Sequence, residues 1–376
     1  MDEYQQPNGV LRNRLGKTTH EDLKVAEARL TAMRTATLET SGAYSHQGFE
    51  RLQAIHRHVF QDVYEWAGQA RTTDLGKAAF EGDDTLTRFT PAAQIGAEAR
   101  RIFTQVAEQG HFKGLDRLTF AERAADHFAA VNTLHPFREG NGRAQVAYIS
   151  RLAEEAGHPL DFRGVSRERM VAVSIDASRG ELGPMRRMFD ELSDPSRARP
   201  LGVAADFLEA NRSTLGADWR EHYLSTTTPG QQYNGQFLVA DGERKHFIML
   251  ERSPDRFTVG NVKDLPNAGA GLRFQEPVAF TASMTPEQKA QRWVDDVTRA
   301  APRGLMASTL EAEARNLANE AAPGAATSPA RSPFEAREIL PHVEAVLSQQ
   351  ISQARVADQM ARAVGVRKGH GLDVVR

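Results

Sequence analysis

A nine-residue segment, residues 135–143, holds the side chains of this sequence that are best suited to chemistry. It reads His-Pro-Phe-Arg-Glu-Gly-Asn-Gly-Arg. His135 is the group in it whose ordinary pKa lies near 7, which suits removal of a proton from an attacking hydroxyl. Glu139 offers a carboxylate to Mg²⁺, an ion that takes one or two carboxylates beside phosphate oxygens. The segment therefore predicts a general base and a metal ligand four residues apart.

The second half of this segment has the composition of an anion-binding site. Gly140 and Gly142 allow a phosphate to approach the main chain where a helix begins and its first N–H groups lack partners. Asn141 adds a neutral donor and Arg143 a fixed positive charge. Phe137 is apolar and is expected to anchor the loop in the core. A Gly-Asn-Gly alone more often marks a turn, but the whole segment predicts phosphate-centred transfer.

Helices must position this loop. Apolar residues at three- and four-residue steps predict helices over 119–134 and 142–156, which meet at the loop, and Thr119 with Glu122 predicts a capping box. Further helices are expected from about residue 21, over 48–66, over 91–110 and within 166–192. The run 72–89 has the composition of a hairpin.

The segment 135–143 resembles the signature of the Fic family of protein AMP-transferases, and residues 59–68 with Arg71 resemble a second part of it. The resemblance covers about residues 20–195. It implies a helical fold with a hairpin flap that aligns a target segment by strand pairing. It also implies His135 as the base, Glu139 as the Mg²⁺ ligand, and a set of phosphate-binding groups: Gly140, Asn141, Gly142 and Arg143. Lys77 and Phe80 are the expected target-docking residues at the tip of the flap.

One position departs from the family pattern. The family's second arginine, three residues after the first, is replaced by Val146. Valine cannot hold a terminal phosphate or pair with an inhibitory glutamate, so nucleotide use is expected to be altered unless Arg138, Gln145 or Arg151 substitutes. Residues 35–40 approach the family's inhibitory motif but end in Thr. A separate small antitoxin is an equal expectation.

The resemblance predicts transfer of AMP from Mg·ATP to a Ser, Thr or Tyr hydroxyl of a target protein. Two alternatives stay open. In the first, Val146 indicates a Fic relative that uses another nucleotide or phosphate-linked donor. In the second, the chain is a non-catalytic interaction protein that has the loop but transfers no group.

The rest of the chain predicts a mainly α protein with a small β domain. The expected divisions are a polar lead at 1–20, the Fic domain at 21–195, an OB-like β domain at 201–285, a helical segment at 286–319, a linker at 320–333, and a C-terminal helix with a basic tail at 334–376. Residues 195–200 are expected to be a linker. Tyr233, Phe237, Phe247 and Phe257 are expected to be mostly core, which makes single-strand binding by the β domain less favoured.

Composition limits the other classes. The 376 residues include no cysteine, so disulfides, thiolate nucleophiles and Cys-ligated zinc are excluded. The net charge of -2 gives no general attraction to nucleic acid. With no apolar run long enough to span a bilayer, the expectation is a soluble protein, cytoplasmic in a bacterium. Resemblance to type IV secretion effectors with Fic and OB-like domains adds the expectation of export to a recipient or host cell.

Overall fold

The computed structural model describes residues 2–78, 86–216, 218–241, 243, 245–252, 255–302, 305–322, 336–344 and 346–347. The chain forms two compact units, Met1–Thr227 with Asn234–Val278, and Thr228–Tyr233 with Ala279–Arg376. Each unit is described by itself. Within the described residues, no helix is long and apolar enough to cross a membrane.

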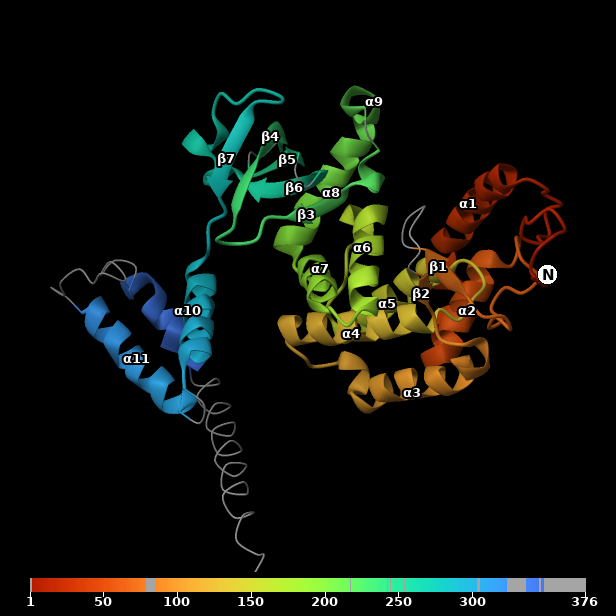
Figure 1. Ribbon diagram of the computed structural model, residues 1–376, viewed down its shortest axis with the longest axis horizontal. Helices are drawn as coiled ribbons and strands as arrows, with labels where there is room; N and C mark the ends of the chain where they lie inside the picture. The colour runs from red at the N-terminus through yellow and green to blue at the C-terminus, as the bar shows by residue number, and fades with distance from the viewer. Residues whose placement is uncertain are drawn as a thin grey trace, which may run out of the picture. The chain divides into compact units, whose positions relative to one another are not determined.

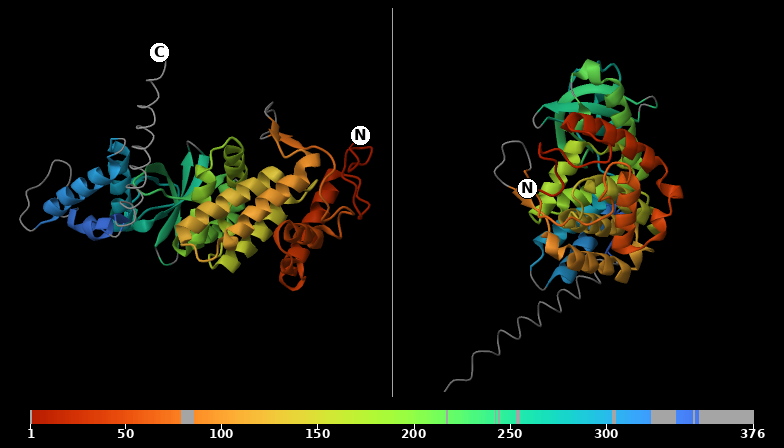
Figure 2. Two further views of the ribbon diagram at one scale, coloured as in Figure 1. Left: turned by 90° about the horizontal axis from the view of Figure 1, so that it is seen from below. Right: turned by 90° about the vertical axis from the view of Figure 1, so that its right-hand side faces the viewer.

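The first unit is mainly helical (Figure 1). Its α-helices are α1 (His20–Ala36), α2 (Gly48–Phe60), α3 (Ile95–Glu108), α4 (Arg117–Leu134), α5 (Asn141–Ala156), α6 (Arg167–Ser178), α7 (Gly183–Ser193), α8 (Pro195–Ala210) and α9 (Arg212–Leu215). Short 3-10 helices lie at Leu38–Thr40, Ala43–Ser45, Ala92–Gln94, Gly110–Phe112, Phe162–Gly164, Trp219–Glu221, Val262–Asp264 and Pro266–Gly269. Helix α5 packs against both α2 and α4, and α4 also packs along α7 (Figure 2).

The predicted helices around the chemical segment are confirmed, but the start of α4 was predicted wrongly. Its N-cap is Asp116, whose carboxylate accepts hydrogen bonds from the main-chain N–H groups of Leu118 at 3.1 Å and Thr119 at 3.0 Å. The capping box expected from Thr119 and Glu122 is therefore absent from this helix start. An aspartate three residues before Thr119 performs the same task, because any short side-chain acceptor at this position satisfies the first N–H groups.

The predicted polar lead packs against the helical unit and carries its own hydrogen bonds over its described residues. Val10 is buried, and the main-chain N–H of Arg14 donates to the carbonyl of Val63 at 2.8 Å. The Asn13 side chain bonds four main-chain groups of the lead, those of Leu11, Leu15 and twice Lys17. Polar composition hid these contacts because the polar side chains bond the lead's own backbone.

Residues 195–200 are the first part of α8, so the predicted linker is wrong. Pro195 occupies the first turn, where a missing N–H costs nothing, and the Asp194 carboxylate caps the helix by accepting from Ser196 N at 2.9 Å. Two prolines five positions apart, Pro195 and Pro200, look like loop signals, but the first of them favours a helix start.

The β segment forms a five-stranded sheet from β3 (Tyr223–Thr226), β4 (Gln232–Ala240), β5 (His246–Arg252), β6 (Asp255–Asn261) and β7 (Pro277–Thr281). The order is β3-β6-β5-β4-β7; β4 and β6 both run antiparallel to β5, whereas β3 is parallel to β6. Strands β4 and β5 follow each other in the chain and pair antiparallel. Tyr233, Phe237, Phe247 and Phe257 are buried as predicted. The OB-like assignment of the sheet stays a prediction.

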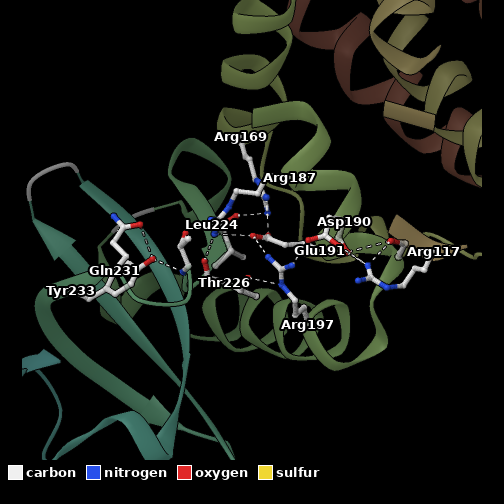
Figure 3. A network of polar contacts seen from close by, with 12 residues as sticks. Arg117, Arg169, Arg187, Asp190, Glu191, Arg197, Leu224, Thr226, Gln231 and Tyr233 are labelled. Atoms are coloured by element: carbon white, nitrogen blue, oxygen red, sulfur yellow. Dashed lines mark hydrogen bonds and ion pairs between the residues drawn. The ribbon is translucent and has the colours of Figure 1, made fainter. Parts of the chain in front are cut away.

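A buried ion cluster joins the helices to the sheet (Figure 3). Arg169 and Glu191 are both fully buried and lie 2.8 Å apart, and Arg197 and Arg187 approach the same carboxylate at 2.9 and 3.0 Å. Arg169 also donates to the carbonyl of Leu224 in β3 at 3.1 Å. Although burial opposes it, the three guanidinium groups lower the pKa of Glu191. The cluster therefore stays charged and fixes α6, α7 and α8 to the edge of the sheet.

The second unit contains α10 (Pro286–Ala300), α11 (Met306–Ala321) and a further helical stretch at 336–344. A capping box formed by Thr285 and Gln288 begins α10. Apolar residues such as Val294, Leu310 and Val343 share one core. Helices α10 and α11 lie in the segment predicted as helical at 286–319, and most of the predicted linker and the basic tail lie outside the described residues.

Candidate active site

The chemical segment is the connection between α4 and α5. His135 ends α4 in a left-handed conformation with φ 43°, and Gly140 precedes α5 with φ 83°. The first N–H groups of α5 therefore lie on the same short loop as the imidazole. This is the helix–loop–helix arrangement that the sequence predicted.

The imidazole of His135 is held on two sides. Its Nδ1 lies 3.3 Å from the carbonyl oxygen of Asn132, and its ring stacks on Phe89 with centroids 3.7 Å apart. A carbonyl only accepts, so this bond places the proton of the neutral ring on Nδ1 and a lone pair on Nε2. His135 as a whole residue is 7% exposed. The geometry suits a base whose tautomer and ring plane are both fixed.

Arg71 ties the loop to the chain that enters the flap. Its main-chain N–H donates to the carbonyl of Pro136 at 2.8 Å, and its Nε donates to the carbonyl of His135 at 2.9 Å. A third bond runs from Nη1 to the Thr73 carbonyl at 2.8 Å. The side chain is buried. Arg71 thus fixes the main chain of the loop, and these hydrogen bonds occupy its guanidinium.

Asn141 closes the loop on itself. Its side-chain oxygen accepts from the Phe137 N–H at 3.0 Å, and its amide nitrogen donates to the Phe137 carbonyl at 2.7 Å. Both residues are buried, and Phe137 is fully buried as the predicted anchor. The side chain of Asn141 is therefore bonded within the loop. Of the groups of Asn141, the main-chain N–H is the one that stays a candidate for phosphate binding.

His56 is a support that sequence reasoning missed. Its ring stacks on Phe137 at 3.8 Å, its Nδ1 accepts from Gly68 N at 2.8 Å, and its Nε2 lies 2.9 Å from the Glu139 carbonyl. Burial lowers the pKa of His56 to about 3, so the ring is neutral and donates from Nε2. The sequence feature that could have identified this support is a histidine within the apolar stripe of α2.

Glu139 fits the predicted metal ligand. Its Oε1 accepts from the Gly140 N–H at 2.9 Å, which orients the carboxylate beside the start of α5. Within the described part of the chain, Oε2 makes no hydrogen bond and no ion pair. The same residues contain no group of three or more His, Asp or Glu that could hold a metal ion. One carboxylate with an available oxygen is the donor set that Mg²⁺ uses when phosphate oxygens complete its coordination.

The two glycines differ in what surrounds them. A Cβ at Gly140 would lie 2.3 Å from ring atom Cζ of Phe60, whereas a Cβ at Gly142 would meet nothing within 4 Å. Gly142 is exposed at the first turn of α5. Space next to unpaired main-chain N–H groups is the arrangement that accepts a phosphate. Gly140 is thus required by packing. Gly142 borders the predicted anion-binding site at the start of α5, which we call the phosphate nest.

Arg143 has a carboxylate partner that no local pattern indicated. Its Nη2 donates to Glu27 of α1, its Nη1 donates to the Thr31 hydroxyl at 3.0 Å, and its guanidinium lies 4.6 Å from the centre of the Phe60 ring. The Tyr64 hydroxyl donates to the same glutamate. Burial and this carboxylate raise the pKa of Tyr64. Arg143 is therefore oriented by α1 and α2 before any nucleotide binds.

Val146 is half-buried and packs against the core of the helical unit. The three suggested substitutes for the family's second arginine are engaged elsewhere. Arg138 pairs with Asp2 at 2.7 Å, Gln145 donates to the Val131 carbonyl at 3.3 Å, and Arg151 pairs with Glu155 at 3.0 Å. None of these contacts directs a side chain to the phosphate nest.

Residues 35–40, which resemble the family's inhibitory motif, make side-chain contacts away from the catalytic loop. Glu39 lies 3.5 Å from Arg151. Thr35 donates its hydroxyl to the carbonyl of Thr31 within α1. These contacts leave the resemblance without structural support as an inhibitory device.

The predicted flap hairpin is present as β1 (Gly76–Ala78) and β2 (Leu86–Arg88), which pair antiparallel. Lys77 lies within β1, opposite Thr87, and not at the tip as predicted. Phe80 lies outside the described residues. Because Phe89 follows β2 directly and stacks on His135, the flap ends next to the imidazole.

Comparison with known proteins agrees with this arrangement. The sequence model of the Fic/DOC family matches residues 48–153. A protein of Salmonella typhimurium named "Probable protein adenylyltransferase Fic" is 35% identical over 197 residues, which are 52% of this chain and 94% of that protein. The protein adenylyltransferase VbhT of Bartonella schoenbuchensis is 36% identical over 48% of this chain and 36% of its own length.

Among solved structures, the type IV secretion system effector protein BepA is similar to this chain. Its TM-score is 0.66 with 27% sequence identity, and the match covers 75% of this chain and 96% of that chain. The likeness extends beyond residues 48–153, because 75% of 376 residues exceeds the length of the family match.

Proposed function

Because this chain belongs to the Fic/DOC family, we propose that it is a protein adenylyltransferase that transfers AMP from ATP to a Ser, Thr or Tyr hydroxyl of a target protein. The single observation that carries the proposal is the loop between α4 and α5. There a tautomer-fixed imidazole, a carboxylate with an available oxygen and an open helix N-terminus lie within eight residues, His135 to Gly142.

In the proposed reaction, Nε2 of His135 takes the proton of the target hydroxyl. The hydroxyl oxygen then forms a bond to the α-phosphorus of ATP, and the bond from that phosphorus to the oxygen bridging to the β-phosphate breaks. Pyrophosphate leaves with the bonding electron pair. The Asn132 carbonyl stabilises the imidazolium that forms, because it accepts the Nδ1 proton throughout.

The phosphates would lie at the start of α5. Its N–H groups face them at Gly142, and Arg143 supplies a fixed positive charge held in place by Glu27 and Thr31. Glu139 would hold Mg²⁺, which supplies charge neutralisation for the transferred and departing phosphates. Such transfer needs positioning and electrostatic stabilisation above all.

The flap would present the target. Paired strands β1 and β2 offer a main-chain edge to an extended segment, and the Phe89 ring at the end of the flap lies against the base. Lys77 in β1 remains the candidate docking residue. This arrangement would bring the target hydroxyl and His135 together.

The experiment uses α-³²P-labelled ATP, Mg²⁺ and a cell lysate, with the natural protein, His135→Asn and Val146→Arg. Asparagine tolerates the left-handed backbone at position 135, so His135→Asn keeps the fold and should lose a hundredfold or more in labelling rate. Val146→Arg should raise labelling, because it restores a cation beside the nest. Equal labelling by the natural protein and His135→Asn would refute the proposal. A modified target whose added mass differs from AMP would identify another donor.

We also propose export by type IV secretion and control by a separate small antitoxin. The likeness to a type IV secretion effector supports the first, and the engagement of Glu39 with Arg151 supports the second, since it leaves that glutamate away from the loop. A translocation reporter fused to the full chain tests export. Loss of labelling activity on co-expression of a small partner protein tests control.

A further inference from the structure

The N-terminal lead, residues 2–18, borders both the catalytic loop and the chain entering the flap. We call residues 71–75 the foot of the flap, because β1 begins directly after them at Gly76. The lead lies outside the residues matched by the family model, 48–153. Its contacts nevertheless reach the loop and the foot at once.

The first contact joins the lead to the catalytic loop. The Asp2 carboxylate accepts from Nε and Nη2 of Arg138 at 3.0 and 2.7 Å. Both side chains are largely shielded from water, with 24% and 16% exposed. Although partial burial opposes it, the guanidinium lowers the pKa of Asp2, so the pair is charged at neutral pH. Arg138 lies three residues after His135, so this contact fixes the loop itself.

The second contact joins the lead to the foot. The Tyr4 hydroxyl accepts from the Thr72 N–H at 3.1 Å and lies 3.0 Å from the Thr72 hydroxyl, which in turn donates to Glu3. Tyr4 is 9% exposed, and its ring packs edge-on against Trp66, with centroids 5.6 Å apart. The Tyr4 hydroxyl therefore contacts both the main-chain N–H and the side-chain hydroxyl of a foot residue.

The foot is thus held from two directions. Arg71 ties it to the carbonyls of His135 and Pro136, and Tyr4 ties the next residue, Thr72, to the lead. The lead returns to the loop through Asp2 and Arg138. These contacts close a ring that contains the main chain of the catalytic loop, the foot and the lead. The contacts of Glu139, Gly142 and Arg143 described above do not involve the lead.

We propose that Asp2 and Tyr4 are positioning residues for AMP transfer: they hold the foot of the flap against the catalytic loop and so set the distance between a target hydroxyl and the base. The inference rests on the proposed function. A misplacement of about 1 Å in a reacting pair costs on the order of a hundredfold in rate. Loosening one of two ties should therefore lower the labelling rate about tenfold and leave Mg·ATP affinity within about twofold of the natural protein.

The test uses Asp2→Asn, Tyr4→Phe and the conservative variant Asp2→Glu. Asparagine removes the charge at nearly constant shape, and phenylalanine removes the hydroxyl but keeps the ring against Trp66. Tyr148→Phe is the matched control, because it loses a buried hydroxyl that bonds His127 at 3.1 Å, away from the foot. Asp206→Asn controls for removal of an exposed carboxylate in α8.

Each variant is measured in three ways: initial labelling rate of lysate proteins, Kd for Mg·ATP, and hydrogen exchange of peptides covering the foot. Asp2→Asn and Tyr4→Phe should label about tenfold more slowly, and exchange at the Thr72 amide should rise because its acceptor is weakened or lost. Asp2→Glu should restore most of the rate. The labelling rate of Arg138→Gln should equal that of Asp2→Asn. The double variant that carries both substitutions should label no more slowly than either single variant.

Labelling that is unchanged in both lead variants overturns the inference, as does a loss equal to that in Tyr148→Phe, which would indicate general destabilisation. Unchanged exchange at Thr72 overturns it as well, whether or not labelling occurs. Absence of labelling by the natural protein and by Val146→Arg would instead refute the proposed function, so the two failures are distinguishable.

Discussion

Alanine substitutions at the two glycines of the loop test its packing and its phosphate binding separately, because each adds one methyl group in a different environment. In Gly140→Ala, the new Cβ would lie 2.3 and 2.5 Å from two ring atoms of Phe60, at a residue with φ 83°. The Phe60 ring is fully buried and stacks on His56 at 4.6 Å, so it has little room to move. Left-handed strain of about 1–2 kcal/mol and overpacking of about 1–3 kcal/mol together predict a loss of about 2–5 kcal/mol in unfolding free energy.

Gly142→Ala should behave in the opposite way. Its Cβ meets nothing within 4 Å, and alanine in place of glycine in a helix gains up to about 1 kcal/mol. The methyl group would, however, project into the space where a phosphate approaches the N–H groups. We expect Mg·ATP affinity to fall about tenfold, which corresponds to about 1.4 kcal/mol.

Urea unfolding and calorimetric titration with Mg·ATP measure the two effects on the same pair of proteins. Wild-type stability in Gly140→Ala would contradict the packing of the loop on Phe60. Wild-type nucleotide affinity in a stable Gly142→Ala would show that phosphates do not bind at the start of α5, and the assignment of the nest would be wrong.

Three further predictions concern charge. Glu139→Gln should leave stability nearly unchanged and raise the Mg²⁺ concentration needed for half-maximal labelling at least tenfold; an unchanged Mg²⁺ requirement would exclude this carboxylate as the ligand. Glu27→Gln removes a negative charge beside Arg143 but keeps an oxygen that can accept its hydrogen bond. The lost charge is worth about 0.5–1 kcal/mol at solvent-like screening, so Kd for Mg·ATP should fall two- to fivefold in low salt, and an unchanged Kd would contradict the phosphate-binding role of Arg143. Burial lowers the pKa of His56 and of His127 from 6.5 to about 3, so the unfolded chain takes up their protons first as pH falls below about 6.5. Stability should therefore be lost between pH 6.5 and 3, by about 2 kcal/mol per histidine at pH 5, and equal urea midpoints at pH 7 and pH 5 would disprove this.

What the sequence could predict was local. Apolar spacing located α4 and α5, glycine and asparagine marked the loop between them, and the lone apolar residue of that loop, Phe137, is its buried anchor. The strand pairing of β1 with β2 also followed from composition. These features depend on neighbours within a few positions, which is the range over which periodicity and turn chemistry act.

What it could not predict depends on pairs far apart in the chain. Glu27 meets Arg143 across 116 positions, and Asp2 meets Arg138 across 136. A glutamate on an amphipathic helix is usually solvated, and no local pattern distinguishes the one that faces an arginine on another helix. The error at 195–200 is different, because the same proline that signals a loop is also favoured at the first turn of a helix.

The residues that support the catalytic loop differ from the residues that carry its chemistry, and the two sets should respond differently to substitution. Three buried groups fix its main chain: Arg71 through two carbonyls, His56 through the Glu139 carbonyl, and Asn141 through both polar groups of Phe137. None of these contacts uses the imidazole of His135, the available oxygen of Glu139 or the open face at Gly142. A substitution among the supports therefore disturbs all three chemical groups together, because they share one rigid loop. A substitution at a chemical group disturbs one step alone, so kinetic effects at His135, Glu139 and Gly142 should separate into proton removal, metal binding and phosphate binding.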